Sequence, residues 1–238
     1  MKPQGGSLKS WPVRIPVGRR HLLGDLAWPA DPHGLVVFAH GSGSSRRSPR
    51  NQHVASVLGD HGYATLLLDL LTEEEERADR RTAHLRFDIG LLADRLVAII
   101  DWIRAQPDTH TIPIGLFGAS TGSGAALLAA AARPAEVSAV VSRGGRPDLA
   151  GSALPHATMP TLLIVGGRDA QVIDLNRAAM VRMPGEVVLE VVPGATHLFE
   201  EEGTLERVAA LAADWFRRYL EPAYERRLDD VALPPQDD

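Results

Sequence analysis

A glycine-serine pattern between two apolar runs constrains the fold of this chain most strongly. Residues 118–122 read Gly-Ala-Ser-Thr-Gly, a G-x-S-x-G pattern. An apolar run, residues 111–117, precedes the pattern, and an alanine-rich run, residues 123–132, follows it. This order predicts a strand, a sharp turn and a helix, the context in which the pattern presents a nucleophilic serine, Ser120. Glycines are expected at 118 and 122 because the crowded turn leaves no room for a Cβ atom.

Strand-like and helix-like segments alternate along the rest of the chain. This alternation favours an α/β fold: a doubly wound, mostly parallel sheet of about seven to eight strands with helices on both faces. The predicted strands are residues 13–17, 21–28, 35–39, 63–68, 111–117, 137–141, 161–165 and 187–192. The predicted helices are residues 51–58, 85–103, 123–132, 175–182 and 204–220.

The length of 238 residues fits one large domain with a well-buried core. We expect residues 1–220 to form this single domain. Residues 221–238 contain three prolines and several acidic residues, and we expect them to form a loosely ordered tail.

The composition excludes several classes of protein. The chain has no cysteine, which excludes a disulfide framework, a thiolate metal site and a cysteine nucleophile. A net charge of −5 gives no reason to expect nucleic-acid binding. No apolar stretch approaches the roughly 18 residues of a membrane span, and residues 1–12 lack the apolar segment of a signal peptide. We therefore expect a cytoplasmic protein without a metal ion, a cofactor, or a membrane or nucleic-acid partner. The oligomeric state stays open.

A nucleophilic serine needs a base, and the base needs an acidic group to orient it. In the folds that use this turn, the chain order is serine, then Asp or Glu, then histidine. His197, the one histidine beyond residue 156, is therefore the expected base. Asp148, Asp169 and Asp174 are candidates for the acid. Asp169 is favoured because it follows an apolar strand and a glycine turn, whereas Asp148 and Asp174 lie in contexts typical of helix starts.

Two backbone N–H groups are expected to bind the oxyanion of the tetrahedral intermediate. One belongs to Thr121, directly after the nucleophile, and the other to Ser42, in the loop after an early strand. His40, at the start of that loop, is expected to hold the loop by a hydrogen bond rather than to act in the chemistry.

Several arginines follow strands that end at the same edge of the predicted sheet, where α/β folds bind their ligands. Arg50, Arg143 and Arg146 are candidates for binding an anionic acyl or leaving group of the substrate. The alternative is that these arginines are solvated or paired with surface carboxylates.

Other interpretations of the same segments are less specific. Residues 118–122 could be a plain tight turn with Ser120 as a helix N-cap. Residues 41–43 followed by Asp69 have some features of a dinucleotide-binding turn, but Arg46 stands where the third glycine belongs. The acidic run at residues 73–76 is interpreted as the start of a solvated helix rather than a metal site.

Four segments together carry a family resemblance. Residues 38–43 (Phe-Ala-His-Gly-Ser-Gly), 118–122, 166–169 (Gly-Gly-Arg-Asp) and 194–197 (Gly-Ala-Thr-His) resemble the dienelactone-hydrolase-like branch of the α/β-hydrolase superfamily. The resemblance covers about residues 10–220 and implies a compact fold without a separate lid domain. The namesake enzymes use a cysteine nucleophile, and this chain has Ser120 in that place.

The resemblance and the residues together predict a serine hydrolase. Its substrate is expected to be a small carboxylic ester or lactone, cleaved through an acyl-enzyme on Ser120. Two alternatives stay open: a ligand-binding or receptor protein with little turnover, and an acyltransferase or thioesterase.

Overall fold

The structure, a computed structural model, describes residues 8–232, with side chains described as far as Arg226. Its centre is one eight-stranded sheet with the strand order β1-β2-β4-β3-β5-β6-β7-β8. β1 pairs with β2, and β2 with β4, in antiparallel fashion, whereas all other neighbours are parallel. The strands are β1 (Lys9–Val17), β2 (Arg20–Trp28), β3 (Leu35–Ala39), β4 (Ala64–Leu68), β5 (Ile114–Ala119), β6 (Val137–Arg143), β7 (Thr161–Gly166) and β8 (Val187–Val192).

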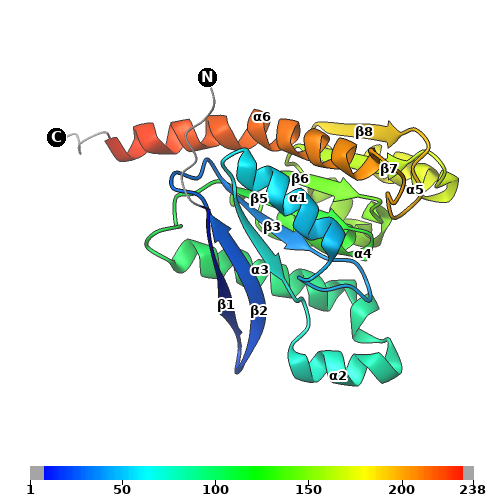
Figure 1. The fold of residues 1–238 in the computed structure, drawn as a ribbon, viewed down its shortest axis with the longest axis horizontal. Helices are drawn as coiled ribbons and strands as arrows, with labels where there is room; N and C mark the ends of the chain where they lie inside the picture. Colours follow the sequence, from blue (N-terminus) through cyan, green and yellow to red (C-terminus); the bar gives the residue numbers. More distant parts are fainter. Residues whose placement is uncertain (1–7, 233–238) are drawn as a thin grey trace.

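Helices cover both faces of the sheet (Figure 1). α1 and α6 lie together on one face, and α3 and α4 pack against each other on the opposite face. The helices are α1 (Pro49–Asp60), α2 (Glu73–Thr82), α3 (Ile89–Ala105), α4 (Thr121–Ala132), α5 (Ala170–Met180) and α6 (Thr204–Ala232), with two 3-10 segments, η1 (Leu85–Phe87) and η2 (Pro147–His156). The predicted α/β class, mostly parallel sheet and two-sided helical cover are confirmed.

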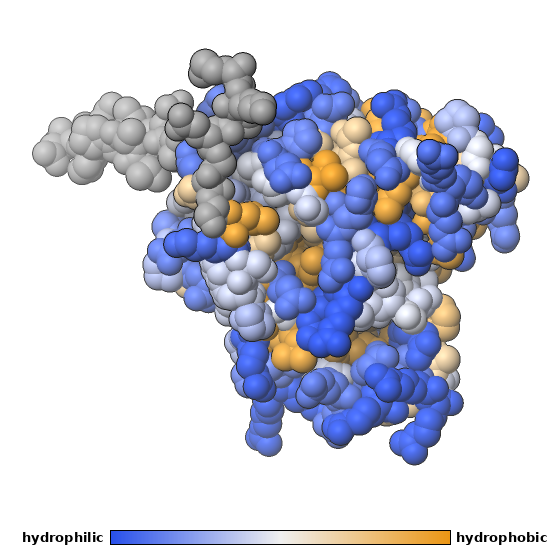
Figure 2. Space-filling model, in the orientation of Figure 1, coloured by the Kyte–Doolittle hydropathy of each residue, from blue (hydrophilic) through white to orange (hydrophobic). Residues whose placement is uncertain are grey.

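The core consists of two large apolar layers, one on each face of the sheet, and a small third cluster of Val165, Val172 and Ile173. Strands β3, β4, β5 and β7 are buried along their whole length. Parallel strands covered on both faces have continuous apolar sequences for this reason. On the face shown in Figure 2, apolar residues reach the surface in separate patches between hydrophilic ones.

The topology has a switch point at one edge of the sheet. The chain leaves β3 for α1 on one face and leaves β5 for α4 on the other, so the loops after β3 and β5 diverge. The carboxyl ends of strands at such a switch point form the ligand site of open α/β sheets. The loop with Ser42 and the turn with Ser120 both lie there.

Two helices, α3 and α5, begin well away from their predicted starts. α3 begins at Ile89 rather than at 85, because Asp88 caps it by accepting the N–H of Leu91 at 3.0 Å. Leu85 fits the helical periodicity but lies in η1. α5 spans Ala170–Met180, so it begins and ends before the predicted range of residues 175–182.

The loosely ordered tail predicted from residue 221 onward is wrong for residues 221–232, which continue α6 past Pro222. Contacts across the fold hold this extension: the Tyr63 hydroxyl donates to Glu221 at 3.2 Å, and the Tyr224 hydroxyl donates to Asp31 at 3.1 Å. The rest of the predicted tail, residues 233–238, lies outside the described residues.

The connection from β6 to β7 contains η2 and no separate lid domain in the part of the chain that the structure describes. The acidic run at residues 73–76 starts α2, where Thr72 and Glu75 form a reciprocal capping box. Within residues 8–232, no helix combines the length and apolar character needed to cross a membrane.

Candidate active site

Ser120 lies at a strained turn between β5 and α4. Its φ of 50° and ψ of −122° fall in a region that non-glycine residues rarely adopt. The neighbouring glycines permit the turn, as predicted. A Cβ on Gly118 would lie 2.5 Å from the Cα of Ser123, and one on Gly122 would lie 2.3 Å from the carbonyl oxygen of Ala39. The turn therefore presents the Ser120 hydroxyl above the carboxyl end of β5.

The loop after β8 carries His197 and is fixed at both sides of it. The N–H of Thr196 donates to the Glu201 carboxylate at 3.0 Å. This hydrogen bond lowers the pKa of Glu201. On the other side, Phe199 has a φ of 55° and is 2% exposed, so its ring anchors the loop in the core. Sequence reasoning missed Glu201, although an acid four residues after the expected base was visible.

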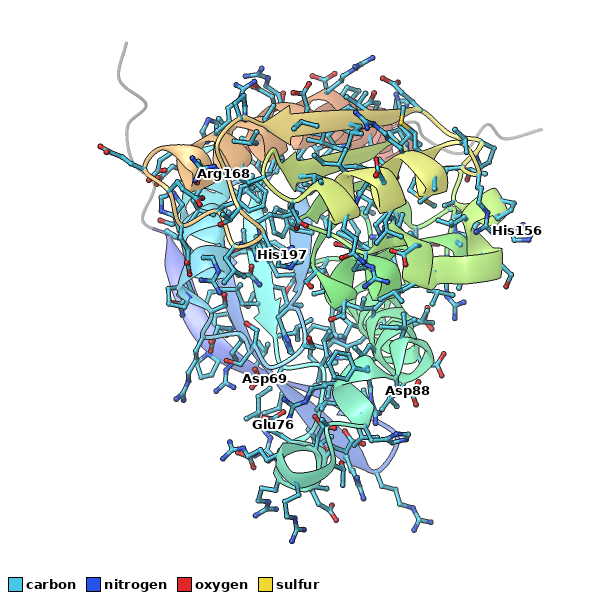
Figure 3. The ribbon with its side chains drawn as sticks, turned by 90° about the vertical axis from the view of Figure 1, so that its right-hand side faces the viewer. Asp69, Glu76, Asp88, His156, Arg168 and His197 are labelled. Carbon is cyan, nitrogen blue, oxygen red and sulfur yellow. The ribbon has the colours of Figure 1, made fainter. Side chains whose placement is uncertain are left out.

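His197 bridges Asp169 and Ser120. Its Nδ1 lies 2.7 Å from Asp169 Oδ2, and its Nε2 lies 3.4 Å from Ser120 Oγ. Because a carboxylate only accepts hydrogen bonds, Nδ1 carries the proton and Nε2 presents its lone pair to the serine hydroxyl. Figure 3 shows His197 in the middle of this edge of the molecule.

The other two candidate acids are paired with arginines rather than with His197. Asp148 accepts two hydrogen bonds from Arg146, at 2.8 and 2.7 Å. Asp174 lies inside α5 and pairs with Arg177 at 3.4 Å. The structure thus brings Asp169, among the three candidates, to the histidine.

The two residues expected to bind an oxyanion through their backbone N–H groups, Ser42 and Thr121, are in contact. The Ser42 N–H donates to Thr121 Oγ1 at 2.8 Å. The Thr121 N–H is in the first turn of α4, where N–H groups have no partner within the helix. In the resting site the Thr121 hydroxyl therefore accepts the hydrogen bond of the Ser42 N–H. The sequence pattern did not predict this interaction.

His40 links the loop after β3 to the chain after β4. Its Nε2 accepts the N–H of Leu70 at 3.1 Å, so its Nδ1 is the protonated nitrogen that donates to the Gly41 carbonyl at 2.9 Å. Burial lowers the pKa of His40 and keeps the ring neutral. These bonds agree with the positional role expected for it. Asp69 accepts the Arg46 N–H at 2.8 Å, so this carboxylate holds the same loop rather than facing a ribose.

The three candidate substrate-binding arginines have different surroundings. Arg146 is paired with Asp148, and Arg50 Nη1 lies 3.3 Å from the exposed carboxylate of Glu200. Arg143 is 8% exposed, and the single hydrogen bond of its side chain runs from Nη2 to Asn51 Oδ1 at 3.4 Å. Sequence reasoning missed Asn51, which lies in the first turn of α1.

A cavity of about 770 Å³ lies between the loop at residues 43–49 and α2. Its polar lining includes His40, Arg46, Asp69 and Glu76, and none of Ser120, Asp169 and His197 lines it. In Figure 3, Asp69 and Glu76 lie below His197, on the side of α2. The described residues contain no group of three side chains arranged to hold a metal ion.

Two proteins of Mycobacterium tuberculosis, from strains CDC 1551 / Oshkosh and H37Rv, are each 57% identical to this chain over 213 residues. Both are provisionally named phosphoribosyl transferases. The match covers 90% of this chain but 47% of each relative, so the chain spans about half the length of the curated relatives it matches.

Solved structures give the same fold. A dienelactone hydrolase from Anabaena variabilis is 58% identical, with a TM-score of 0.88 over 89% of this chain and 98% of that one. A serine hydrolase without a lid from Xanthomonas campestris is 20% identical, with a TM-score of 0.70 over 88% of this chain and 94% of that one, and this likeness concerns the fold alone.

A family model described as the dienelactone hydrolase family matches residues 22–222. This match covers most of the chain, including Ser120, Asp169, His197 and the strands that precede them. The resemblance indicated by the four sequence motifs is confirmed, and the chain belongs to the dienelactone hydrolase family.

Proposed function

We propose that the protein is a serine hydrolase that cleaves a carboxylic ester or lactone of a small substrate through an acyl-enzyme on Ser120. One observation carries the proposal: a single imidazole lies 2.7 Å from a carboxylate and 3.4 Å from a serine hydroxyl held at a strained turn. The first distance is that of a strong hydrogen bond. The second is long, as is common before a substrate binds.

In the first half-reaction, Ser120 Oγ attacks the carbonyl carbon while His197 Nε2 accepts the hydroxyl proton. Asp169 holds the Nδ1–H tautomer and stabilises the imidazolium that forms. His197 then donates the proton to the leaving alcohol oxygen as the bond from carbon to that oxygen breaks. Ser120 is left esterified to the acyl group.

In the second half-reaction, water replaces the alcohol. His197 Nε2 accepts a proton from the water molecule, whose oxygen attacks the acyl carbon. The tetrahedral intermediate then collapses, and His197 returns the proton to Ser120 Oγ. The acid product leaves, and the free enzyme is restored.

The negative oxygen of each intermediate is assigned to the N–H groups of Thr121 and Ser42. Each such donor typically contributes about 2.7–4 kcal/mol of transition-state stabilisation. To bind the oxyanion, the Ser42 N–H must either break its hydrogen bond to Thr121 Oγ1 or donate to both oxygens at once.

Small substrates fit the open surroundings of the site. The His197 side chain is 38% exposed, and the segment between β6 and β7 adds η2 rather than a covering domain. The phosphoribosyl transferase name belongs to relatives twice as long as the matched segment, and the proposed chemistry concerns that segment alone.

Labelling with a fluorophosphonate tests the proposal, because this probe reacts with an activated serine. We expect one label on Ser120 and hydrolysis of short para-nitrophenyl esters. Ser120→Ala is expected to abolish the label and to lower kcat/KM by at least about 10³-fold. Ser138→Ala, on β6, is the matched control and should change neither result.

An unlabelled Ser120, or ester turnover that survives in Ser120→Ala, would refute the proposed role of the serine. Product analysis with a competing alcohol or a thioester substrate then distinguishes hydrolysis from acyl transfer and thioester cleavage. Water as the preferred acceptor and an oxygen ester as the preferred substrate are the expected results.

A further inference from the structure

α2 is a helix without an apolar face. Apart from Ala78 and Thr82, every residue of α2 is charged, and Asp79 is the one that is buried. Figure 1 shows α2 below the sheet and its covering helices, apart from both. A helix normally stabilises a fold by burying an apolar stripe against the core. Because α2 has no such stripe, covering the core does not explain its presence.

Polar contacts hold α2 in place. The buried carboxylate of Asp79 accepts the N–H of Leu85 at 2.6 Å and the Nε–H of Arg86 at 2.5 Å. The carboxylate of Glu75 accepts a hydrogen bond from Arg95 Nη2, on α3, at 2.8 Å. These bonds hold α2 opposite the loop at residues 43–49, and the cavity of about 770 Å³ lies between the two.

The cavity has the size of a ligand pocket but not the usual apolar lining. Pockets for small molecules measure roughly 300–1,000 Å³ and are lined mostly by apolar side chains. Here Leu23, Pro49 and Leu71 are the apolar part of the lining, and the polar part includes four arginines and three carboxylates. An alkyl or aromatic group bound there would displace water from these polar groups without giving them a hydrogen-bond partner.

The more buried polar groups of the lining already have partners. The Arg46 guanidinium lies between Asp25 and Asp69, and Asp69 also accepts the Arg46 N–H at 2.8 Å. Both ring nitrogens of His40 are hydrogen-bonded to backbone groups. These residues therefore form a fixed wall of the cavity.

The opposite wall carries charged groups that are available to a ligand. Glu73 and Arg77 on α2, and Arg47 on the facing loop, line the cavity and make no ion pair among the residues whose side chains are described. Glu76 reaches Arg80 only at 3.7 Å, and both side chains are exposed to solvent. Hydrogen-bond donors and acceptors thus stand side by side around one space.

A hydroxyl-rich group fits this mixed lining better than an ion does. A carboxylate in the cavity would meet Glu73 and Glu76 as well as the arginines, and an ammonium group would meet Arg47 and Arg77. A hydroxyl group donates to a carboxylate and accepts from a guanidinium. A neutral polyol therefore satisfies both kinds of side chain at once.

The cavity adjoins the candidate active site without containing its reacting groups. Gly43, which directly follows Ser42 of the expected oxyanion site, lines the cavity, whereas Ser120 and His197 do not. In Figure 3, Glu76 lies below His197 at the same edge of the molecule. A ligand in the cavity is thus the part of a substrate that binds and does not react.

We propose that this cavity binds a hydroxyl-rich group of the substrate, a sugar or a polyol, through Glu76, Arg77 and the charged side chains beside them. The substrate class is then the esters or lactones of sugars and polyols. This inference rests on the proposed serine hydrolase function, and it gives a role in substrate selection to a cavity that the hydrolytic mechanism leaves unused.

A pair of matched esters tests the alcohol side of the substrate. Cyclohexyl acetate and myo-inositol monoacetate share the acetyl group and the carbon ring, and they differ in the free hydroxyl groups of the ring. The readout is kcat/KM for the inositol ester divided by kcat/KM for the cyclohexyl ester. We expect Glu76→Ala/Arg77→Ala to lower this ratio by roughly tenfold or more, as the loss of one hydrogen bond to a charged group does.

A pair of lactones tests the acyl side. δ-Valerolactone and D-glucono-δ-lactone share the ring and differ in its hydroxyl-bearing substituents, and a pH-stat follows their hydrolysis above the spontaneous rate. A ratio that falls for the lactones alone places the hydroxyl-rich group in the acyl part, and one that falls for the acetates alone places it in the leaving alcohol. Ratios that the double variant leaves unchanged for both pairs would overturn the proposal.

The matched control is Asp214→Ala/Arg217→Ala, which removes one carboxylate and one guanidinium from an exposed ion pair on α6. Both double variants keep the net charge, and alanine favours the helix at these positions. A ratio between two substrates also cancels any unfolded fraction of the enzyme. The control should leave both ratios unchanged, and an equal fall in the control would overturn the assignment to the cavity.

Failure of the two proposals can be told apart. If Ser120 takes the fluorophosphonate label but neither ratio depends on Glu76 and Arg77, the cavity assignment is wrong and the hydrolase stands. If Ser120 is inert, titration calorimetry with myo-inositol measures binding directly. Affinity that Glu76→Ala/Arg77→Ala lowers by roughly tenfold would support the cavity site without the hydrolase. No binding, or equal binding to both proteins, would refute it.

Discussion

At the scale of single residues, the hydroxyl of Thr121 competes with the oxyanion for the Ser42 N–H. The 2.8 Å bond between them exists in the resting site. A transition state that uses this N–H must take it from Thr121, and a typical hydrogen bond of this kind contributes about 0.5–1.5 kcal/mol. Part of the stabilisation of the intermediate is therefore offset by the bond that is lost.

Thr121→Val keeps the branched shape and removes the acceptor. We expect kcat/KM for a neutral ester to rise roughly two- to tenfold, because the Ser42 N–H no longer leaves a bond to reach the oxyanion. The free energy of unfolding should fall by about 1 kcal/mol, because the hydrogen bond between the Ser42 N–H and the Thr121 hydroxyl is lost. Steady-state kinetics and urea unfolding measure the two effects. Thr121→Ser, which keeps the hydroxyl, is the control, and a lower kcat/KM in Thr121→Val would mean that the hydroxyl supports the transition state instead.

The sequence predicted that Ser120, Asp169 and His197 lie close together, because each follows a strand. Ser120, Asp169 and His197 come after β5, β7 and β8, and parallel strands bring such positions to one edge. The sequence did not decide whether the arginines are paired with carboxylates. For Arg143 this depends on α1, which is distant in the chain. Nothing in a local pattern indicates that Asn51 is its partner.

At the scale of secondary-structure elements, β3, β5 and α4 are packed very closely. One added methyl group between them would displace the site. Gly122 lies on α4 directly against the end of β3. A Cβ there would lie 2.3 Å from the carbonyl oxygen of Ala39 and 2.6 Å from that of His40. Neither contact can be relieved by a side-chain rotation, since both atoms belong to the backbone.

Gly122→Ala is therefore expected to push α4 away from β3 and to move Ser120 out of reach of His197. We expect a loss of several kcal/mol of folding free energy and no detectable esterase activity. Gly90→Ala in α3 is the matched control: its Cβ would meet only Asp88 Oδ1, at 3.5 Å, so it should be neutral or slightly stabilising. Circular dichroism during thermal unfolding measures the stability of both variants, and hydrolysis of a para-nitrophenyl ester measures their activity. Equal stability of the two variants would show that the packing is looser than these contacts require.

The elements themselves differ in how far local sequence determines them. β3 and β8 have the predicted bounds, because each is a short, largely apolar run that starts after Gly34 or Glu186 and stops before His40 or Pro193. The start of α3 was misplaced, since Leu85 continues the apolar period while the Asp88 cap sets the first turn. A cap is a local hydrogen bond, and periodicity carries no information about it.

At the scale of the whole molecule, the candidate site and the contacts that hold the end of α6 lie at opposite ends of the sheet. The carboxyl end carries Ser120 and His197, and the opposite end carries the contacts of the last part of α6. Tyr63 and Asp31 precede β4 and β3, so their bonds to Glu221 and Tyr224 lie away from the site. The sequence did not predict this extension, because Pro222 removes a helix hydrogen bond and only distant partners offset that loss.

This separation predicts that the extension of α6 affects stability and not catalysis. A chain ending at Leu220 loses the Tyr63–Glu221 and Tyr224–Asp31 hydrogen bonds. We expect the free energy of unfolding to fall by about 1–3 kcal/mol and Tm by roughly 2–12 °C. The kcat/KM for a neutral ester at 25 °C should stay within about twofold, because the first part of α6 still covers the sheet beneath the site. A chain ending at Ala232 is the control, since it keeps both bonds. If the shorter chain lost its activity while its Tm stayed the same, the two ends of the sheet would be coupled.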